Sequence, residues 1–228
     1  MMQLRAAADR GHANFGWLDT HHSFSFGHYY DPKWMGHSAL RVINDDMVAP
    51  GGGFATHPHA NMEILTCVLK GTIEHRDSLG HAEQIPAGDF QLMSAGSGIR
   101  HSEYNPSQGE ALRLLQIWIE PNEFGTPPGY QQKQIVNQPG MTLVASPDGE
   151  AGSFRIRQQA RVWRLQIAEG ETLEWALQGR HGYLHMISGE LTGNGLAARP
   201  GDGLLSRDEA SWTLIASEGS EALLFDLP

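Results

Sequence analysis

Short segments in which apolar and polar residues alternate recur along the whole chain, and they limit the possible folds more than any other feature. Residues 22–26, 113–119 and 154–157 are examples, each close to residues typical of turns. Helical periodicity with capping residues is scarce. Because many short strands separated by turn signals are typical of antiparallel sandwiches and barrels, the sequence predicts an all-β fold.

Two pairs of metal-binding side chains have strand spacing. His57 and His59 are separated by one residue, and so are His101 and Glu103. Because alternate side chains of a strand point to the same face, two neighbouring strands could present all four groups to one point. Three imidazoles and one carboxylate suit one divalent transition metal (Fe, Mn, Co, Ni, Cu or Zn) and are poor ligands for Ca or Mg.

A pair of histidines with this spacing is weak evidence when it stands alone, since two solvated histidines on a surface strand give the same pattern. The surrounding sequence favours a metal site. Residues 63–71 are apolar and rich in β-branched side chains, which predicts a buried strand after the first pair. A turn is predicted at residues 86–89. Four other histidines are expected to have no partner at ligand spacing: His28, His37, His75 and His81.

The residues around both pairs resemble the two motifs of the cupin superfamily. The first motif is matched by Gly51, His57, His59, Glu63 and Gly71, and the start of the second by Gly80, Pro86 and Gly88. The histidine that usually follows is absent, since position 91 is Gln. The run of residues 93–103 that replaces it is similar to the pirin branch of the cupins, as are residues 22–26, 29–32 and 39–46.

The resemblance implies two tandem cupin domains, that is, a bicupin of two jelly-roll β-barrels. We expect an N-terminal metal-binding cupin domain over residues 1–135, a C-terminal degenerate cupin domain over residues 136–228, and a linker within residues 120–140. An internal repeat supports this, because residues 69–71 resemble residues 187–189. The positions that correspond to the four ligands in the second half are apolar: Trp175, Leu177, Leu214 and Ala216.

The identity of the carboxylate ligand has two possible answers. The general cupin pattern favours Glu63, which keeps strand parity with the first histidine pair. The pirin resemblance instead implies the ligand set His57, His59, His101 and Glu103. Glu63 would then orient a ligand imidazole, and Glu103 could also act as the base that takes a proton from the substrate.

The resemblance further implies a metal-dependent dioxygenase that cleaves flavonols such as quercetin with O2 and releases carbon monoxide. Fe(II) is the expected metal, with Zn, Ni, Mn, Co or Cu as alternatives. Two other function classes stay open. One is a metal-containing regulatory protein that binds a protein partner according to the redox state of the metal, and the other is a different small-molecule cupin enzyme such as an isomerase.

Composition argues against several other partners. The net charge is -10, and residues 1–120 and 121–228 each hold 8 Lys and Arg against 13 Asp and Glu, which disfavours direct nucleic-acid binding. No stretch has the apolar length of a membrane span, and residues 1–10 lack the apolar centre of a signal peptide. We therefore expect a cytoplasmic protein, in which the single cysteine, Cys67, is a buried thiol.

Overall fold

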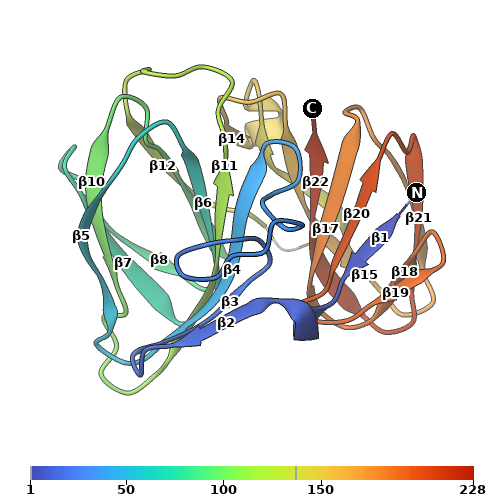
Figure 1. Cartoon of the computed structure of the whole chain (residues 1–228), viewed down its shortest axis with the longest axis horizontal. Helices are drawn as coiled ribbons and strands as arrows, with labels where there is room; N and C mark the ends of the chain where they lie inside the picture. Colours follow the sequence, from blue (N-terminus) through green and yellow to red (C-terminus); the bar gives the residue numbers. More distant parts are fainter. Residues whose placement is uncertain (1, 137) are drawn as a thin grey trace. The chain divides into compact units, whose positions relative to one another are not determined.

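The structure is a computed structural model that describes residues 2–136 and 138–228 (Figure 1). Its contacts divide the chain into two compact units. The N-terminal unit comprises Gly11–Gly36 and Leu40–Ile135, and the C-terminal unit comprises Met1–Arg10, His37–Ala39 and Val136–Pro228. The assignment of separate domains to residues 1–135 and 136–228 stays a prediction.

The N-terminal unit contains a seven-stranded and a four-stranded antiparallel sheet. The larger sheet has the order β12 (Gly129–Gln134), β9 (Asp89–Ser94), β6 (Glu63–Lys70), β11 (Leu112–Ile119), β4 (Leu40–Val48), β3 (Leu18–His22) and β2 (Gly11–Asn14). The smaller sheet has the order β5 (Gly53–His59), β10 (Ile99–Tyr104), β7 (Thr72–Asp77) and β8 (Ala82–Pro86).

Apolar side chains from both sheets of the N-terminal unit form a common core. Val68 of the larger sheet packs in one cluster with Ile73 and Ile85 of the smaller sheet, and all three are fully buried. Their burial removes apolar surface from water, which is the main favourable contribution to folding. The sheets therefore pack face to face, and polar groups on their inner faces need partners inside the unit.

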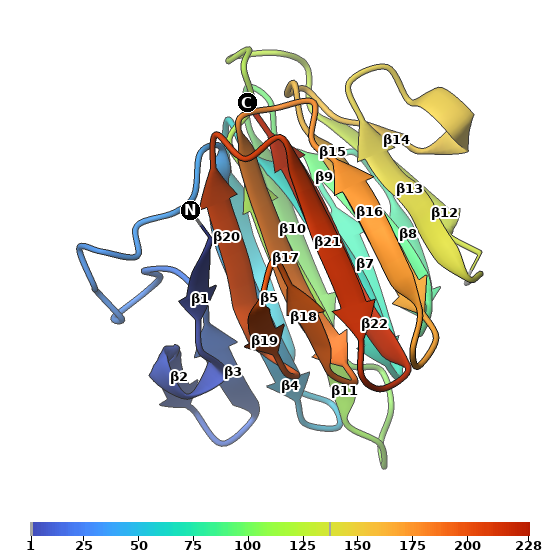
Figure 2. The same ribbon diagram turned by 90° about the vertical axis from the view of Figure 1, so that its right-hand side faces the viewer.

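The C-terminal unit repeats this plan. Its larger sheet has the order β1 (Gln3–Arg5), β20 (Gly203–Arg207), β17 (His181–Ser188), β22 (Ser220–Leu227), β15 (Arg161–Ile167), β13 (Gly140–Ser146) and β14 (Phe154–Arg155). Its smaller sheet has the order β16 (Thr172–Ala176), β21 (Ser211–Ala216), β18 (Leu191–Gly193) and β19 (Leu196–Ala198), which Figure 2 shows side by side. Two short 3-10 helices complete the unit, η1 (Ala7–Asp9) and η2 (Glu150–Gly152).

The internal repeat is visible in the strand order. Strands β6 and β17 hold the same place in the two larger sheets, and each is followed by a glycine with a positive φ, 78° at Gly71 and 75° at Gly189. A left-handed backbone conformation at this point favours glycine in both units. The prediction of an all-β chain with two related barrel-like units is confirmed. None of the helices in residues 2–136 and 138–228 has the length and apolar character needed to cross a bilayer.

Three local predictions differ from the structure. Strand β3 ends at His22, and the next two residues, Ser23 and Phe24, are both buried instead of alternating. Residues 154–157 form only the two-residue strand β14. The expected linker contains strand β12, which pairs with β9 and is held by Tyr130, whose ring stacks on His75 at a centroid distance of 4.7 Å.

Candidate metal centre

Strands β5 and β10 bring the three predicted histidines together. The two strands are antiparallel neighbours, His57 lies directly opposite His101, and an irregularity in the register follows His101. Ring centroids are 4.4 Å apart for His57 and His101, 4.8 Å for His57 and His59, and 4.9 Å for His59 and His101. One ring nitrogen from each of the three lies within 4.8 Å of the others. The strand spacing, together with the pairing of β5 and β10 in this register, therefore produces a convergent imidazole cluster.

A hydrogen bond to the backbone fixes the tautomer of His57, one of the three imidazoles of this cluster. The Nδ1 atom of His57 lies 2.8 Å from the carbonyl oxygen of Ala55, which can only accept, so Nδ1 carries the proton. The Nε2 lone pair of His57 then faces the Nε2 atom of His101 at 3.0 Å. The Nδ1 atom of His101 is buried without a hydrogen-bond partner. Such a buried polar ring is costly unless another group binds it, and a metal ion fits that requirement.

The protonation states of these rings also suit a metal. Burial, followed by the nearby His57, lowers the pKa of His101 to about 2 and that of His59 to about 4. Both imidazoles are therefore neutral at physiological pH. The neutral form is the one that binds a metal ion, so no proton has to be displaced from these two rings.

Glu103 is 2 % exposed, and its carboxylate lies within 4.8 Å of a ring nitrogen of His101. Its carboxylate oxygens accept hydrogen bonds from the side-chain amides of Gln91 at 2.8 Å and Gln116 at 2.9 Å. Burial, and then the neighbouring carboxyl group of Asp46, raises the pKa of Glu103 to about 7. Each carboxylate oxygen has a second lone pair, so the amides leave room for a further interaction.

The four predicted ligands fall into two overlapping groups. One contains His57, His59 and His101, and the other contains His101, Glu103 and His75, with the ligand atoms of each within 4.8 Å. His101 belongs to both groups. The assignment of all four predicted residues to one ion stays a prediction.

A row of polar side chains crosses the larger sheet and holds Glu103 in place. Gln116, Thr66 and Gln91 are register partners on three adjacent strands, β11, β6 and β9. The hydroxyl of Thr66 donates to Gln116 at 2.9 Å and accepts from Gln91 at 3.1 Å, and the hydroxyl of Tyr130 donates to Gln91 at 3.1 Å. Gln91, which replaces the usual cupin histidine, therefore binds the carboxylate of Glu103.

Strand patterns alone did not predict this row, although the sequence contains a signal for it. Thr66, Gln91 and Gln116 are uncharged polar residues within otherwise apolar parts of their strands. All three are buried. A buried polar residue in an apolar strand needs a partner, and its partners are usually functional or structural polar groups.

The expectation that His75 has no partner at ligand spacing was wrong. His75 lies opposite Glu103 in the register of β7 and β10, and it joins Glu103 and His101 in the second group. Its Nε2 atom is 3.1 Å from Asp77, whose carboxylate also lies 2.9 Å from Nδ1 of His81. His75 and Asp77 have the same spacing as the predicted pairs, so the strand rule applied to residues 75–77 would have found them.

Glu63 has a different environment. It is 1 % exposed, and its carboxylate accepts a hydrogen bond of 2.8 Å from the hydroxyl of Ser94. Within residues 2–136 and 138–228, no group of potential ligands includes it. The geometry therefore favours Glu103 over Glu63 as the carboxylate nearest to the imidazoles.

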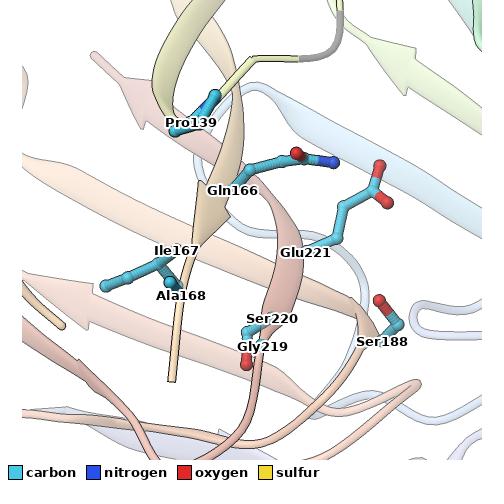
Figure 3. Close-up of a pocket in the computed structure, with 8 residues that line it drawn as sticks. All are labelled: Pro139, Gln166, Ile167, Ala168, Ser188, Gly219, Ser220 and Glu221. Carbon is cyan, nitrogen blue, oxygen red and sulfur yellow. The ribbon is translucent and has the colours of Figure 1, made fainter. Parts of the chain in front are cut away.

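Two cavities differ in their suitability for a substrate. A cavity of about 510 Å³ borders His59 and is lined also by Pro58, Ser78 and Arg100. The C-terminal unit has a cavity of about 280 Å³ with no histidine or cysteine in its lining (Figure 3). Its one carboxylate, Glu221, lies 2.7 Å from the guanidinium of Arg164. The cavity beside His59 is therefore the better candidate.

Comparison with known proteins agrees with this picture. Residues 3–119 match the Pirin family, and residues 143–227 match the quercetinase C-terminal cupin domain, so the fold is a bicupin. The chain is 52% identical to a quercetin 2,3-dioxygenase of Escherichia coli, over 100% of this chain and 99% of that protein.

Solved structures show the same relationship. The crystal structure of the bacterial pirin YhhW from Escherichia coli in complex with nickel(II) has a TM-score of 0.98 and 52% identity, covering 100% of this chain and 99% of that chain. A quercetin 2,3-dioxygenase from Acinetobacter baumannii is 22% identical, with a TM-score of 0.80 over 99% of this chain and 86% of that chain, and it shares the fold. From its family matches and from relatives that align along its whole length, the chain belongs to the pirin family.

Proposed function

We propose that this protein is a metal-dependent dioxygenase that cleaves flavonols such as quercetin with O2 and releases carbon monoxide. The convergence of His57, His59 and His101 next to a buried carboxylic acid is the observation that carries the proposal. Full-length similarity to a protein named quercetin 2,3-dioxygenase supports the same substrate class.

His57, His59, His101 and Glu103 would hold one divalent transition metal, for which Fe(II) is our first choice and Ni, Zn, Mn, Co or Cu are alternatives. When bound, such a metal supplies Lewis acidity that makes a coordinated hydroxyl group a stronger acid. The neutral imidazoles and the row of amides behind Glu103 keep these groups in position before the metal binds. Preorganisation of this kind lowers the cost of forming the centre.

Glu103 is our candidate for the base in the reaction. Because burial raises the pKa of Glu103, its carboxylate is a stronger proton acceptor than an exposed carboxylate. It would accept the proton of the flavonol hydroxyl and so favour the electron-rich anion that reacts with O2. The cavity of about 510 Å³ beside His59 lies within the size range of small-molecule sites and would admit the flavonol.

We also propose that the protein works in the cytoplasm. Cys67 is the single cysteine of the chain and is buried, so the fold uses no internal disulfide, which agrees with a reducing compartment. Fractionation of cells with an antibody against the native protein tests this. Recovery of the protein in a secreted or periplasmic fraction would contradict it.

The activity is tested on metal-free protein that is reconstituted separately with Fe(II), Ni(II), Mn(II), Co(II), Cu(II) and Zn(II). Oxygen uptake and carbon monoxide release are measured with quercetin as the substrate. At least one metal should give equal amounts of O2 consumed and carbon monoxide released, and a chelator should abolish both. Lack of carbon monoxide with every metal, in protein shown to contain that metal, would favour a binding or regulatory role.

A further inference from the structure

We propose that His12, Asp19 and His21 form a second metal site, on the surface of the N-terminal unit, for a divalent transition ion of the zinc class. The site consists of residues from β2 and β3 only, which lie next to each other at one edge of the larger sheet (Figure 1). It does not depend on the proposed function, since it shares no residue with the centre around His101.

The strand register brings the three side chains to one face. His12 lies directly opposite His21, and Asn14 lies opposite Asp19. Since His12 and Asn14 are two residues apart, as are Asp19 and His21, all four side chains point to the same side of the ribbon. The potential ligand atoms of His12, Asp19 and His21 lie within 4.8 Å of one another.

The side chains already have the geometry of a partly assembled site. The rings of His12 and His21 are stacked at a centroid distance of 4.5 Å and an interplanar angle of 20°. The Oδ1 atom of Asp19 lies 2.7 Å from Nε2 of His12 and 4.0 Å from Nδ1 of His21. One carboxylate oxygen therefore faces a nitrogen of each ring, and small side-chain rotations would direct all three toward one ion.

Asn14 fixes the carboxylate from behind. Its Nδ2 atom donates to Oδ2 of Asp19 at 3.3 Å, and its own Oδ1 atom accepts from the backbone N–H of Gly16 at 2.8 Å. Asn14 thus holds Oδ2 of Asp19, while Oδ1 faces the two rings and contacts Nε2 of His12, the contact that a bound ion would replace. Supporting hydrogen bonds of this kind are typical of ligand carboxylates in metal sites.

The ligand set determines the class of ion. Two imidazoles and one carboxylate suit Zn²⁺ and similar borderline ions and are a poor set for Ca²⁺ or Mg²⁺. The side chains of His12, Asp19 and His21 are 53 %, 44 % and 41 % exposed, so water can complete the coordination. The exposure also means that the ion exchanges with solvent, in contrast to one held by the buried His101.

Zinc alone is the probe for the test. The full chain is first loaded with zinc at the centre around His101 and freed of excess metal, and Zn²⁺ is then titrated by calorimetry. The wild-type chain should bind one further zinc ion, and the His12→Asn/His21→Asn variant should not. The Asn14→Ala variant should bind it about 10-fold more weakly, as expected for loss of a group that supports a ligand.

His28→Asn is the matched control, because His28 is an exposed histidine of the same unit that belongs to no ligand group in the described residues. It should bind the further ion as the wild type does. In nuclear magnetic resonance spectra of the wild-type chain, added zinc should shift the ring protons of His12 and His21 and leave those of His28 unchanged. Failure of the wild type to bind a further ion, or equal binding by the double variant, would overturn the proposal.

Discussion

The two units have the same strand order, yet their smaller sheets present opposite chemistry. In the N-terminal unit, the register places His57 opposite His101 across β5 and β10. In the C-terminal unit, Trp175 lies opposite Trp212 across the corresponding strands β16 and β21, with their rings in an edge contact at 5.3 Å. The tryptophans belong to the apolar core of their unit. The equivalent pair of strands thus carries a polar centre in the N-terminal unit and part of the apolar core in the C-terminal unit.

The larger sheets differ in the same way. The N-terminal unit has a row of polar register partners: Gln116, Thr66 and Gln91. The C-terminal unit has a row of leucines on the corresponding strands β22, β17 and β20: Leu224, Leu184 and Leu204. Each leucine is fully buried. A buried carboxylate such as Glu103 on the smaller sheet therefore requires polar side chains on the facing larger sheet as well, because every buried polar group needs a partner.

The largest expected effect concerns the imidazole pair itself. The His57→Ala/His101→Ala variant should lose the tightly held metal and all metal-dependent activity, since two of the predicted ligands are removed. Elemental analysis after dialysis measures the metal content. The reference chain carries His12→Asn/His21→Asn, and the test chain carries His57→Ala/His101→Ala in addition, so that the surface site contributes to neither. The reference chain should hold one metal ion. Full metal content in the His57→Ala/His101→Ala chain would show that the centre is elsewhere.

The second prediction separates the two carboxylates. Glu103→Ala should lower metal affinity by more than Glu63→Ala does, because Glu103 shares a ligand group with His101 and Glu63 bonds to Ser94. Loss of a group that only supports a ligand lowers metal affinity by about 10 to 100-fold, so Glu63→Ala should lower it by no more than about 100-fold. Competition with a chelator of known affinity measures both variants. The reverse rank would make Glu63 the ligand.

The third prediction transfers one residue from the C-terminal row to the N-terminal row. Gln91→Leu introduces the residue found at the corresponding Leu204 and removes one amide from Glu103. Metal affinity should fall by about 10 to 100-fold, as for other groups that support a ligand. Gln132→Leu is a control, since Gln132 is on the neighbouring strand β12 and makes no hydrogen bond to Glu103 that the structure describes. Equal affinity of Gln91→Leu and the wild type would mean that the amide does not position Glu103.

The smallest effect concerns a buried histidine in the C-terminal unit. Burial, and then His181, lowers the pKa of His37 to about 4, while its Nε2 atom donates to the carbonyl of Ser206 at 3.1 Å. A folded-state pKa below the unfolded value of 6.5 contributes stability that is present above pH 6.5 and is lost as pH falls toward 4. Between pH 8 and pH 5 this loss should be about 2 kcal/mol.

Denaturant unfolding at several pH values measures that loss. His37→Gln keeps an N–H donor for Ser206 but cannot titrate, so its unfolding free energy should depend less on pH over this range. An unchanged pH dependence in His37→Gln would assign the acid sensitivity to other groups.

Much of the fold and of the imidazole cluster could be predicted because the deciding information is local. Strand parity places His57 and His59 on one face, and the apolar run of residues 63–71 predicts the buried strand that forms as Glu63–Lys70. The repeat of turn glycines predicts the second unit. The buried strand and the shared face of the two histidines depend on neighbours within a few residues, and the second unit on a repeated motif, so all three can be read from the sequence.

The remaining features depend on register between distant strands. The contact of Gln91 and Gln116 with Glu103 joins residues 12 and 13 positions apart on opposite sheets, and no periodicity within one strand predicts it. Strand β12 was not predicted, because the prolines around it indicate a break in regular structure and its own sequence is short and polar. Its position is set by pairing with β9 and by the packing of Tyr130.

Strand β1 has a consequence for the synthesis of the protein. Gln3–Arg5 pairs with Leu205–Gly203, so the edge of one sheet joins the first and the last parts of the chain. Ribosomes add about 5–20 residues per second, so β1 waits on the order of 10–40 s for its partner after it is made. The C-terminal sheet therefore cannot be completed during translation until β20 and then β22 have been released, whereas the N-terminal unit contains no strand beyond Gln134 and can finish folding earlier.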